Sequence, residues 1–225
     1  MICQYSIKGN PVYKFIMPLI KSNMYVILSD RQALIIDPNV NEEAMNLLEG
    51  YNVEKIVIIL THEHYDHISG VNYFRSKWNC TVYGNKCCKE RCEKPEKNLA
   101  AYFMALFIGR SEEERQQAAE LFQDHYHCMV DRIFERKMEL EFGQMKWELV
   151  STPGHSSGSI CILVENALFS GDSLVQGAKV LTRMPDGDRN AYRMITRPFL
   201  ESLPQNTIVF PGHGQESIMR ELELG

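Results

Sequence analysis

The sequence predicts an α/β (α+β) protein in which strands and helices alternate in two halves, each beginning with strands. Three observations lead to this prediction. Short segments rich in β-branched and aromatic residues open the chain and are separated by turn formers. The nearly uninterrupted apolar run VEKIVIILT is typical of a strand buried on both faces. A second β-rich stretch begins at Met145, after a charged middle region.

The first half is predicted to contain four antiparallel strands, a helix and a buried strand. The segment NEEAMNLLEG has Asn41 as a candidate N-cap, acidic residues in its first turn and Gly50 at its end, which predicts a helix. Polar residues that directly follow a buried strand are where α/β proteins usually place their chemistry. The four strands are predicted at residues 2–7, 12–17, 24–29 and 33–36.

Residues from about 85 to 137 are predicted to form a helical insertion or lid. The segment NLAAYFMALFIG predicts an apolar helix closed by Gly109, and Ser111 with Glu114 predicts a capping box at the start of another helix. The region is too apolar to remain a solvated linker.

The second half is predicted to return to strands and then to end in helices. GDRNAYRMITRPFLESL is typical of a helix that Pro198 shortens or kinks. NTIVFPGHG predicts a buried strand followed by a polar loop, and QESIMRELEL predicts a short final helix.

Length and composition favour one soluble domain over residues 1–225, since 44% of the 225 residues are hydrophobic and 24% are charged. The net charge of −5 disfavours a nucleic-acid surface, and no apolar run approaches the about 20 residues that cross a bilayer. We therefore expect a small-molecule substrate and neither nucleic-acid nor membrane partners. The absence of a signal-peptide pattern and of a disulfide-like cysteine framework predicts a cytoplasmic protein.

Five of the seven histidines follow strand-like runs, in loops rich in glycine or acidic residues. Any one of them alone would more often be an ordinary buried or surface histidine. The joint pattern indicates a metal site, because the THEHYDH loop can direct side chains toward two points a few Å apart while later loops supply further ligands. The candidates are His62, His64, Asp66 and His67 in THEHYDH, His155 in TPGHSSGS, Asp172 in FSGDSL and His213 in FPGHG.

These motifs resemble those of the metallo-β-lactamase-fold superfamily, in particular its glyoxalase II-like (hydroxyacylglutathione hydrolase-like) branch. The resemblance covers most of the chain apart from the helical insertion. It implies a four-layer αβ/βα sandwich of two mixed β-sheets with a dinuclear metal site at one edge.

Carried over residue by residue, the resemblance assigns two metal sites and a bridge between them. It implies that His62, His64 and His155 hold one ion, that Asp66, His67 and His213 hold the other, and that Asp172 bridges both. Two divalent ions, expected to be Zn²⁺ with iron or manganese as alternatives, would supply a bridging hydroxide near neutral pH. Asp66 is then the expected orienter or proton acceptor of the attacking water.

The expected activity is hydrolysis of a small-molecule thioester, ester or lactone. Glutathione thioesters are not expected, because LTRMPDGDRNAYR replaces the GRTD-like stretch of glyoxalase II and no basic helical region follows His213. The alternatives are a phosphodiesterase or nuclease, a mononuclear-iron persulfide dioxygenase, and a ligand-sensing protein without turnover.

Three further groups of residues carry open alternatives. The apolar side chains of the insertion either form a lid over the metal cleft or pack against the core or a homodimer partner; they are Tyr102, Phe103, Met104, Leu106 and Phe107. A second group of cysteines and histidines has a spacing that is irregular for zinc, which favours a structural or solvated role over a second metal site. Its members are Cys87, Cys88, Cys92, His125, His127 and Cys128. Arg183, Arg189 and Arg193 either bind a carboxylate or phosphate of the substrate or form a solvated face.

Overall fold

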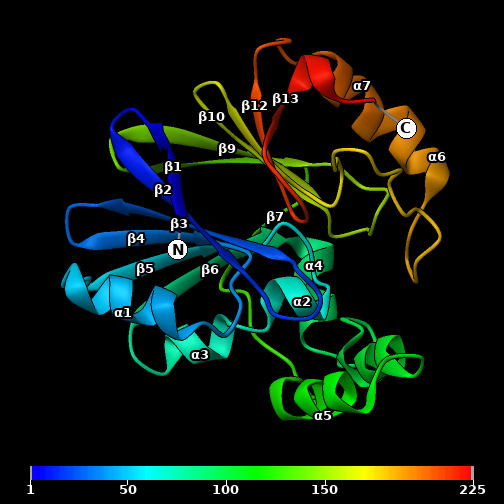
Figure 1. The fold of residues 1–225 in the computed structure, drawn as a ribbon. Helices are drawn as coiled ribbons and strands as arrows, with labels where there is room; N and C mark the ends of the chain where they lie inside the picture. Colours follow the sequence, from blue (N-terminus) through cyan, green and yellow to red (C-terminus); the bar gives the residue numbers. More distant parts are fainter. Residues whose placement is uncertain (1, 224–225) are drawn as a thin grey trace.

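The computed structural model describes residues 2–223, with side chains described from residue 5. Two mixed β-sheets face each other, and helices cover the outer face of each sheet, which gives four layers (Figure 1). The predicted αβ/βα sandwich is therefore confirmed.

The first sheet has seven strands in chain order. Neighbours are antiparallel from β1 to β4 and parallel from β4 to β7. The apolar run predicted as a buried strand is β5, in the parallel part, where both faces are covered. The strands are β1 (Ile2–Ile7), β2 (Asn10–Ile16), β3 (Asn23–Ser29), β4 (Gln32–Ile36), β5 (Lys55–Ile59), β6 (Asn79–Asn85) and β7 (Arg132–Phe134).

The second sheet has six strands in the spatial order β13-β12-β11-β10-β9-β8. All neighbouring strands are antiparallel except β11 and β12, which are parallel. The strands are β8 (Lys137–Phe142), β9 (Met145–Ser151), β10 (Ile160–Val164), β11 (Ala167–Gly171), β12 (Ile208–Pro211) and β13 (Ser217–Ile218).

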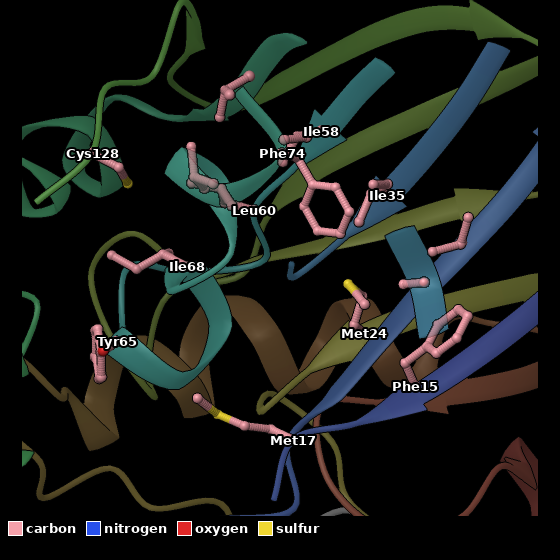
Figure 2. Packing of buried hydrophobic residues seen from close by; sticks show 14 of the residues in the cluster. Phe15, Met17, Met24, Ile35, Ile58, Leu60, Tyr65, Ile68, Phe74 and Cys128 are labelled. Carbon is pink, nitrogen blue, oxygen red and sulfur yellow. The ribbon is translucent and has the colours of Figure 1, made fainter. Parts of the chain in front are cut away.

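Apolar packing holds the layers together. Between the sheets, the rings of Phe169 and Phe210 stack at 4.7 Å, and Trp147 is fully buried beside them. On the outer face of the first sheet, Phe74 of helix α3 (Val71–Arg75) packs toward Ile35 and Ile58 (Figure 2). The sheets and their covering helices thus form one continuous scaffold for the loops at their edge.

Helix α1 (Glu42–Gly50) begins as the sequence predicts. The Asn41 side chain accepts a hydrogen bond of 3.0 Å from the backbone amide of Ala44. An N-cap of this kind satisfies one of the amides that have no partner inside the helix.

Replacing Asn41 by alanine is expected to lower the free energy of unfolding by about 1 kcal/mol, since the Ala44 amide loses its acceptor. Urea denaturation followed by circular dichroism measures this change. Asn41→Asp keeps an acceptor and is the matched control. Equal losses in both variants would contradict a capping role.

The insertion contains α4 (Lys86–Cys92), a 3₁₀ helix η1 (Ala100–Phe107) and α5 (Glu112–Leu121). The capping box of Ser111 and Glu114 is confirmed. The predicted apolar helix is present as the 3₁₀ helix η1. The predicted C-terminal limit near residue 137 is wrong, because β7 adds a parallel strand to the edge of the first sheet beside β6 and buries Phe134 between the sheets.

The C-terminal region also departs in part from expectation. The predicted helix consists of α6 (Arg189–Ala191), a π-helical turn η2 (Tyr192–Thr196) and α7 (Arg197–Glu201), so it is widened just before Pro198, which has no amide hydrogen to donate. The predicted final helix is wrong. Ser217 instead pairs with Val209 of β12, and a 3₁₀ turn η3 (Met219–Glu221) follows. Among residues 2–223, no helix is long and apolar enough to cross a membrane.

Candidate metal centre

The candidate ligands lie on loops and on one short helix at one edge of the two sheets. Thr61 to His64 follow β5, and the short helix α2 (Tyr65–Ile68) carries Asp66 and His67. Asp172 and His213 follow the parallel strands β11 and β12. Because the carboxyl ends of parallel strands meet at the same edge, residues far apart in the sequence come together here.

One group contains three buried imidazoles. His62, His64 and His155 each place a ring nitrogen so that the three atoms lie within 4.8 Å of one another. The Nε2 atom of His155 lies 3.0 Å from Nδ1 of His64. Three imidazoles converging on one point match the donor set that zinc prefers.

A second group combines a carboxylate with two imidazoles. Asp66, His67 and His213 also place ligand atoms within 4.8 Å of one another. Asp66 Oδ2 lies 3.4 Å from His67 Nε2 and 3.3 Å from His213 Nε2. This is a separate mixed donor set next to the first.

Asp172 lies between the two groups. Its Oδ1 is 3.6 Å from His67 Nε2, and its Oδ2 is 3.6 Å from His155 Nε2 and 3.7 Å from His213 Nε2. The carboxylate therefore faces both donor sets at once. This is the position that a bridging ligand requires, and the assignment of the seven residues as ligands stays a prediction.

Unpartnered atoms show that these residues suit a cation. His62 Nε2 and Asp172 Oδ1 are buried and have no hydrogen-bond partner among the described residues. A buried polar atom without a partner costs about 1–3 kcal/mol. Two such atoms within one cluster of nitrogen and oxygen donors fit divalent metal ions.

Asp37, which the sequence analysis did not single out as a site residue, orients His67. Its Oδ2 lies 2.9 Å from His67 Nδ1, while the backbone and hydroxyl of Thr61 donate to its two oxygens at 2.7 and 2.6 Å. A carboxylate that accepts from the outer nitrogen of a histidine fixes the tautomer and turns the other nitrogen inward. Its position at the carboxyl end of a predicted strand was the available signal.

Two other contacts orient histidines in the same way. Thr61 Oγ1 lies 3.0 Å from His62 Nδ1, and the backbone carbonyl of Leu181 lies 3.1 Å from His155 Nδ1. Both outer nitrogens can donate to these oxygens, which leaves the Nε2 atoms free to face the centre.

The two donor sets differ in their protonation. Burial, followed by repulsion from the neighbouring imidazoles, holds the pKa of His62 well below its ordinary value and lowers the pKa of His64 to about 3. Burial would also lower the pKa of His67, but Asp66 and Asp172 raise it well above its ordinary value. The first set therefore offers neutral imidazoles, the form that binds metals. In the second set the carboxylates favour protonated imidazoles, and a bound cation can take the place of those protons.

Glu63 points away from both donor sets. Its fully buried carboxylate receives Arg91 Nε at 2.7 Å and the Ser156 hydroxyl at 3.0 Å. Arg91 in turn lies 3.3 Å from Asp186. Glu63 therefore ties the histidine loop to α4 and to the loops that carry His155 and Leu181, which is a positioning role.

Gly212 permits the closest approach in the site. A β-carbon at this position would lie 2.3 Å from Asp172 Oδ1 and 2.9 Å from His67 Cε1. Any side chain would displace the Asp172 carboxylate. Glycine at position 212 of FPGHG thus has a steric reason.

A cavity of about 440 Å³ opens onto the centre. Tyr102, Phe103 and Leu106 of η1 line it together with Leu99, whereas Phe107 is buried and Met104 packs against the outer core. The insertion thus forms an apolar wall of the cavity and also anchors itself in the core. The cavity suits a substrate with an apolar portion.

The residues of the irregular cysteine and histidine cluster lie apart from the centre. Cys88, Cys92 and Cys128 are buried in the outer core. Hydrogen bonds from Cys92 to Cys128 and Cys88, together with burial, hold the pKa of Cys92 well above its ordinary value. His125 and His127 are exposed.

The variant His125→Ala/His127→Ala is expected to retain full activity and metal content, because both side chains face solvent. Steady-state kinetics and elemental analysis check this prediction. A loss of either quantity would require these histidines to reach the centre, which would contradict their placement.

Comparisons with known proteins agree with this geometry. The chain is 32% identical over 201 residues to "Probable metallo-hydrolase YqgX" of Bacillus subtilis, a match that covers 88% of this chain and 87% of that protein. A hydroxyacylglutathione hydrolase of Prochlorococcus marinus is 24% identical over 88% of this chain and 67% of its own length.

Solved structures give the same result. The BLEG-1 B3 metallo-β-lactamase superposes with a TM-score of 0.75 at 27% identity, covering 93% of this chain and 95% of that chain. TTHA1623 in a di-iron-bound form superposes with a TM-score of 0.73 at 26% identity, covering 93% and 96%. A family model of the metallo-β-lactamase superfamily matches residues 17–213, and the chain therefore belongs to this superfamily.

Proposed function

We propose that this protein is a hydrolase that uses two divalent metal ions to cleave a small-molecule thioester, ester or lactone. The observation that carries the proposal is the place of Asp172, whose two oxygens face both donor sets at 3.6–3.7 Å while Oδ1 has no hydrogen-bond partner among the described residues. Metal ions held there would lower the pKa of bound water toward about 7 and stabilise negative charge on the substrate.

The residues of the chain bind and orient the reactants. Asp66 belongs to the second donor set and also lines the cavity, so its carboxylate can orient the attacking water and accept its proton. Phe103 and Leu106 hold the apolar portion of the substrate and exclude bulk water from the reacting bond.

The metal is proposed to be zinc, because three neutral imidazoles form one donor set. Iron is the main alternative, since mixed histidine and carboxylate sets also suit iron and a relative at 26% identity was solved with two iron atoms. Membership of the glyoxalase II-like branch and a cytoplasmic location stay predictions.

Metal removal tests the proposed function. Zinc-loaded protein is expected to hydrolyse members of a panel of acyl thioesters, aryl esters and lactones faster than phosphodiesters. Dialysis against a chelator is expected to abolish this activity, and added Zn²⁺ is expected to restore it. Undiminished hydrolysis by metal-free protein, or a preference for phosphodiesters, would contradict the proposal.

A further inference from the structure

A second cavity, of about 410 Å³, lies beside the metal centre and is strongly basic. Its walls are the loop at 179–183 and one face of the helical segment at 189–197. Five of its lining residues carry a positive charge, and none carries a negative charge, in a chain whose net charge is −5. The cations are Lys179, Arg183, Arg189, Arg193 and Arg197.

The helix presents its arginines together. Arg189, Arg193 and Arg197 follow one another at intervals of four residues, a spacing that places side chains on one face of a helix. All three line the same cavity. A planar guanidinium offers paired donors that match the oxygens of a phosphate.

Among the described residues, the one ion pair made by a cation of this cavity joins Arg197 to Glu201 at 2.8 Å. Asp188 caps the helix by accepting from the amides of Asn190 and Ala191. Asp186 is held by Ser157 and Arg91.

Four cations are therefore left without a counter-charge. In residues 2–223 no ion pair or side-chain hydrogen bond involves Lys179, Arg183, Arg189 or Arg193. Like charges held around one hollow repel each other, and a bound anion removes that cost.

One residue joins this basic cavity to the metal centre. Leu181 lines both cavities, and its carbonyl oxygen lies 3.1 Å from Nδ1 of His155. An anion in the basic cavity would thus lie next to the wall of the reaction cavity.

We infer that the basic cavity binds a phosphate or diphosphate group on the leaving portion of the substrate, while the acyl portion lies in the apolar cavity. This inference rests on the proposed function and names its substrate class, a phosphorylated thioester or ester. Water adds to the acyl carbonyl and the C–S or C–O bond breaks. The products are a carboxylic acid and a phosphorylated thiol or alcohol, which takes up the second hydrogen of the water.

A matched pair of ligands tests the inference, because 4′-phosphopantetheine differs from pantetheine only by its phosphate. Isothermal titration calorimetry on the zinc-loaded protein is expected to show at least about tenfold tighter binding of the phosphorylated compound, as charge-assisted hydrogen bonds to phosphate predict. The variant Arg189→Gln/Arg193→Gln is expected to lose this preference. The variant Arg132→Gln/Arg136→Gln removes two exposed arginines elsewhere and is expected to keep it.

Hydrolysis of the matching acyl thioesters separates the two proposals. A lower KM for the phosphorylated thioester, lost only in Arg189→Gln/Arg193→Gln and with kcat on the unphosphorylated thioester unchanged, supports the assignment. Equal affinity for both ligands, or equal losses in both double variants, overturns it. Preferential binding of the phosphorylated ligand without hydrolysis of either thioester would support the anion site and would contradict the proposed thioester hydrolysis.

Discussion

Replacing Asp172 by alanine is expected to lower kcat/KM by about a thousandfold or more. The carboxylate faces both donor sets, so its loss would remove the proposed bridge between the two ions. Metal ions supply several kcal/mol of transition-state stabilisation, and about 4 kcal/mol corresponds to a thousandfold change in rate. Steady-state kinetics on the best substrate of the hydrolysis panel measures the effect.

Asp124→Ala is the matched control for this variant, because Asp124 is an exposed acid on the insertion and belongs to neither donor set. It is expected to behave as the wild type. Circular dichroism should show that both variants fold. An Asp172→Ala variant that retains more than about a tenth of the activity would contradict a bridging role, since that loss amounts to only about 1.4 kcal/mol.

Replacing Arg91 by methionine is expected to lower the free energy of unfolding by about 3 kcal/mol. Glu63 is fully buried, and Arg91, whose side chain is 14% exposed, is its only positively charged partner among the described residues. Removing one member of a buried ion pair leaves an uncompensated charge, which typically costs about 3–5 kcal/mol. Urea denaturation of the zinc-loaded variant measures the loss.

The double variant Glu63→Gln/Arg91→Met tests the cause. A neutral amide keeps the hydrogen bond from Ser156 and needs no counter-charge, so more than half of the stability should return. A double variant as unstable as Arg91→Met alone would assign the loss to packing of the arginine stem instead of to the buried charge.

The sequence predicted the strands well because their patterns are local. The four opening strands and the apolar β5 end within a few residues of their predicted limits, since turn formers and apolar runs mark them directly. The short final strand β13 could not be predicted in this way. Ser217 pairs with Val209, and that long-range pairing overrides the helical pattern of QESIMRELEL.

The candidate site was predictable where residue type and spacing carry the chemistry. All seven proposed ligands come together, because each follows a strand that ends at the same edge. The supporting residues were harder to predict. Asp37 and Arg91 act through a hydrogen bond and an ion pair to residues about 30 positions away in the chain. Asp37 is marked only by its position directly after a predicted strand, and nothing in the local sequence distinguishes Arg91.

The lining of the two cavities was still harder to predict from the sequence. Arg183, Arg189 and Arg193 were visible as a possible anion site, but Lys179 and Arg197 join them only through the fold of the loop against the helix. Likewise, the sequence could not divide the insertion into side chains that line the cavity and side chains that anchor it.

The number of metal ions per chain tests the central claim most directly. Elemental analysis of the zinc-reconstituted protein, after removal of loosely bound metal, is expected to give two zinc ions per chain. One ion per chain would contradict the two-metal centre and would favour a mononuclear enzyme. A chain that retains no metal would contradict the proposed hydrolase as a whole.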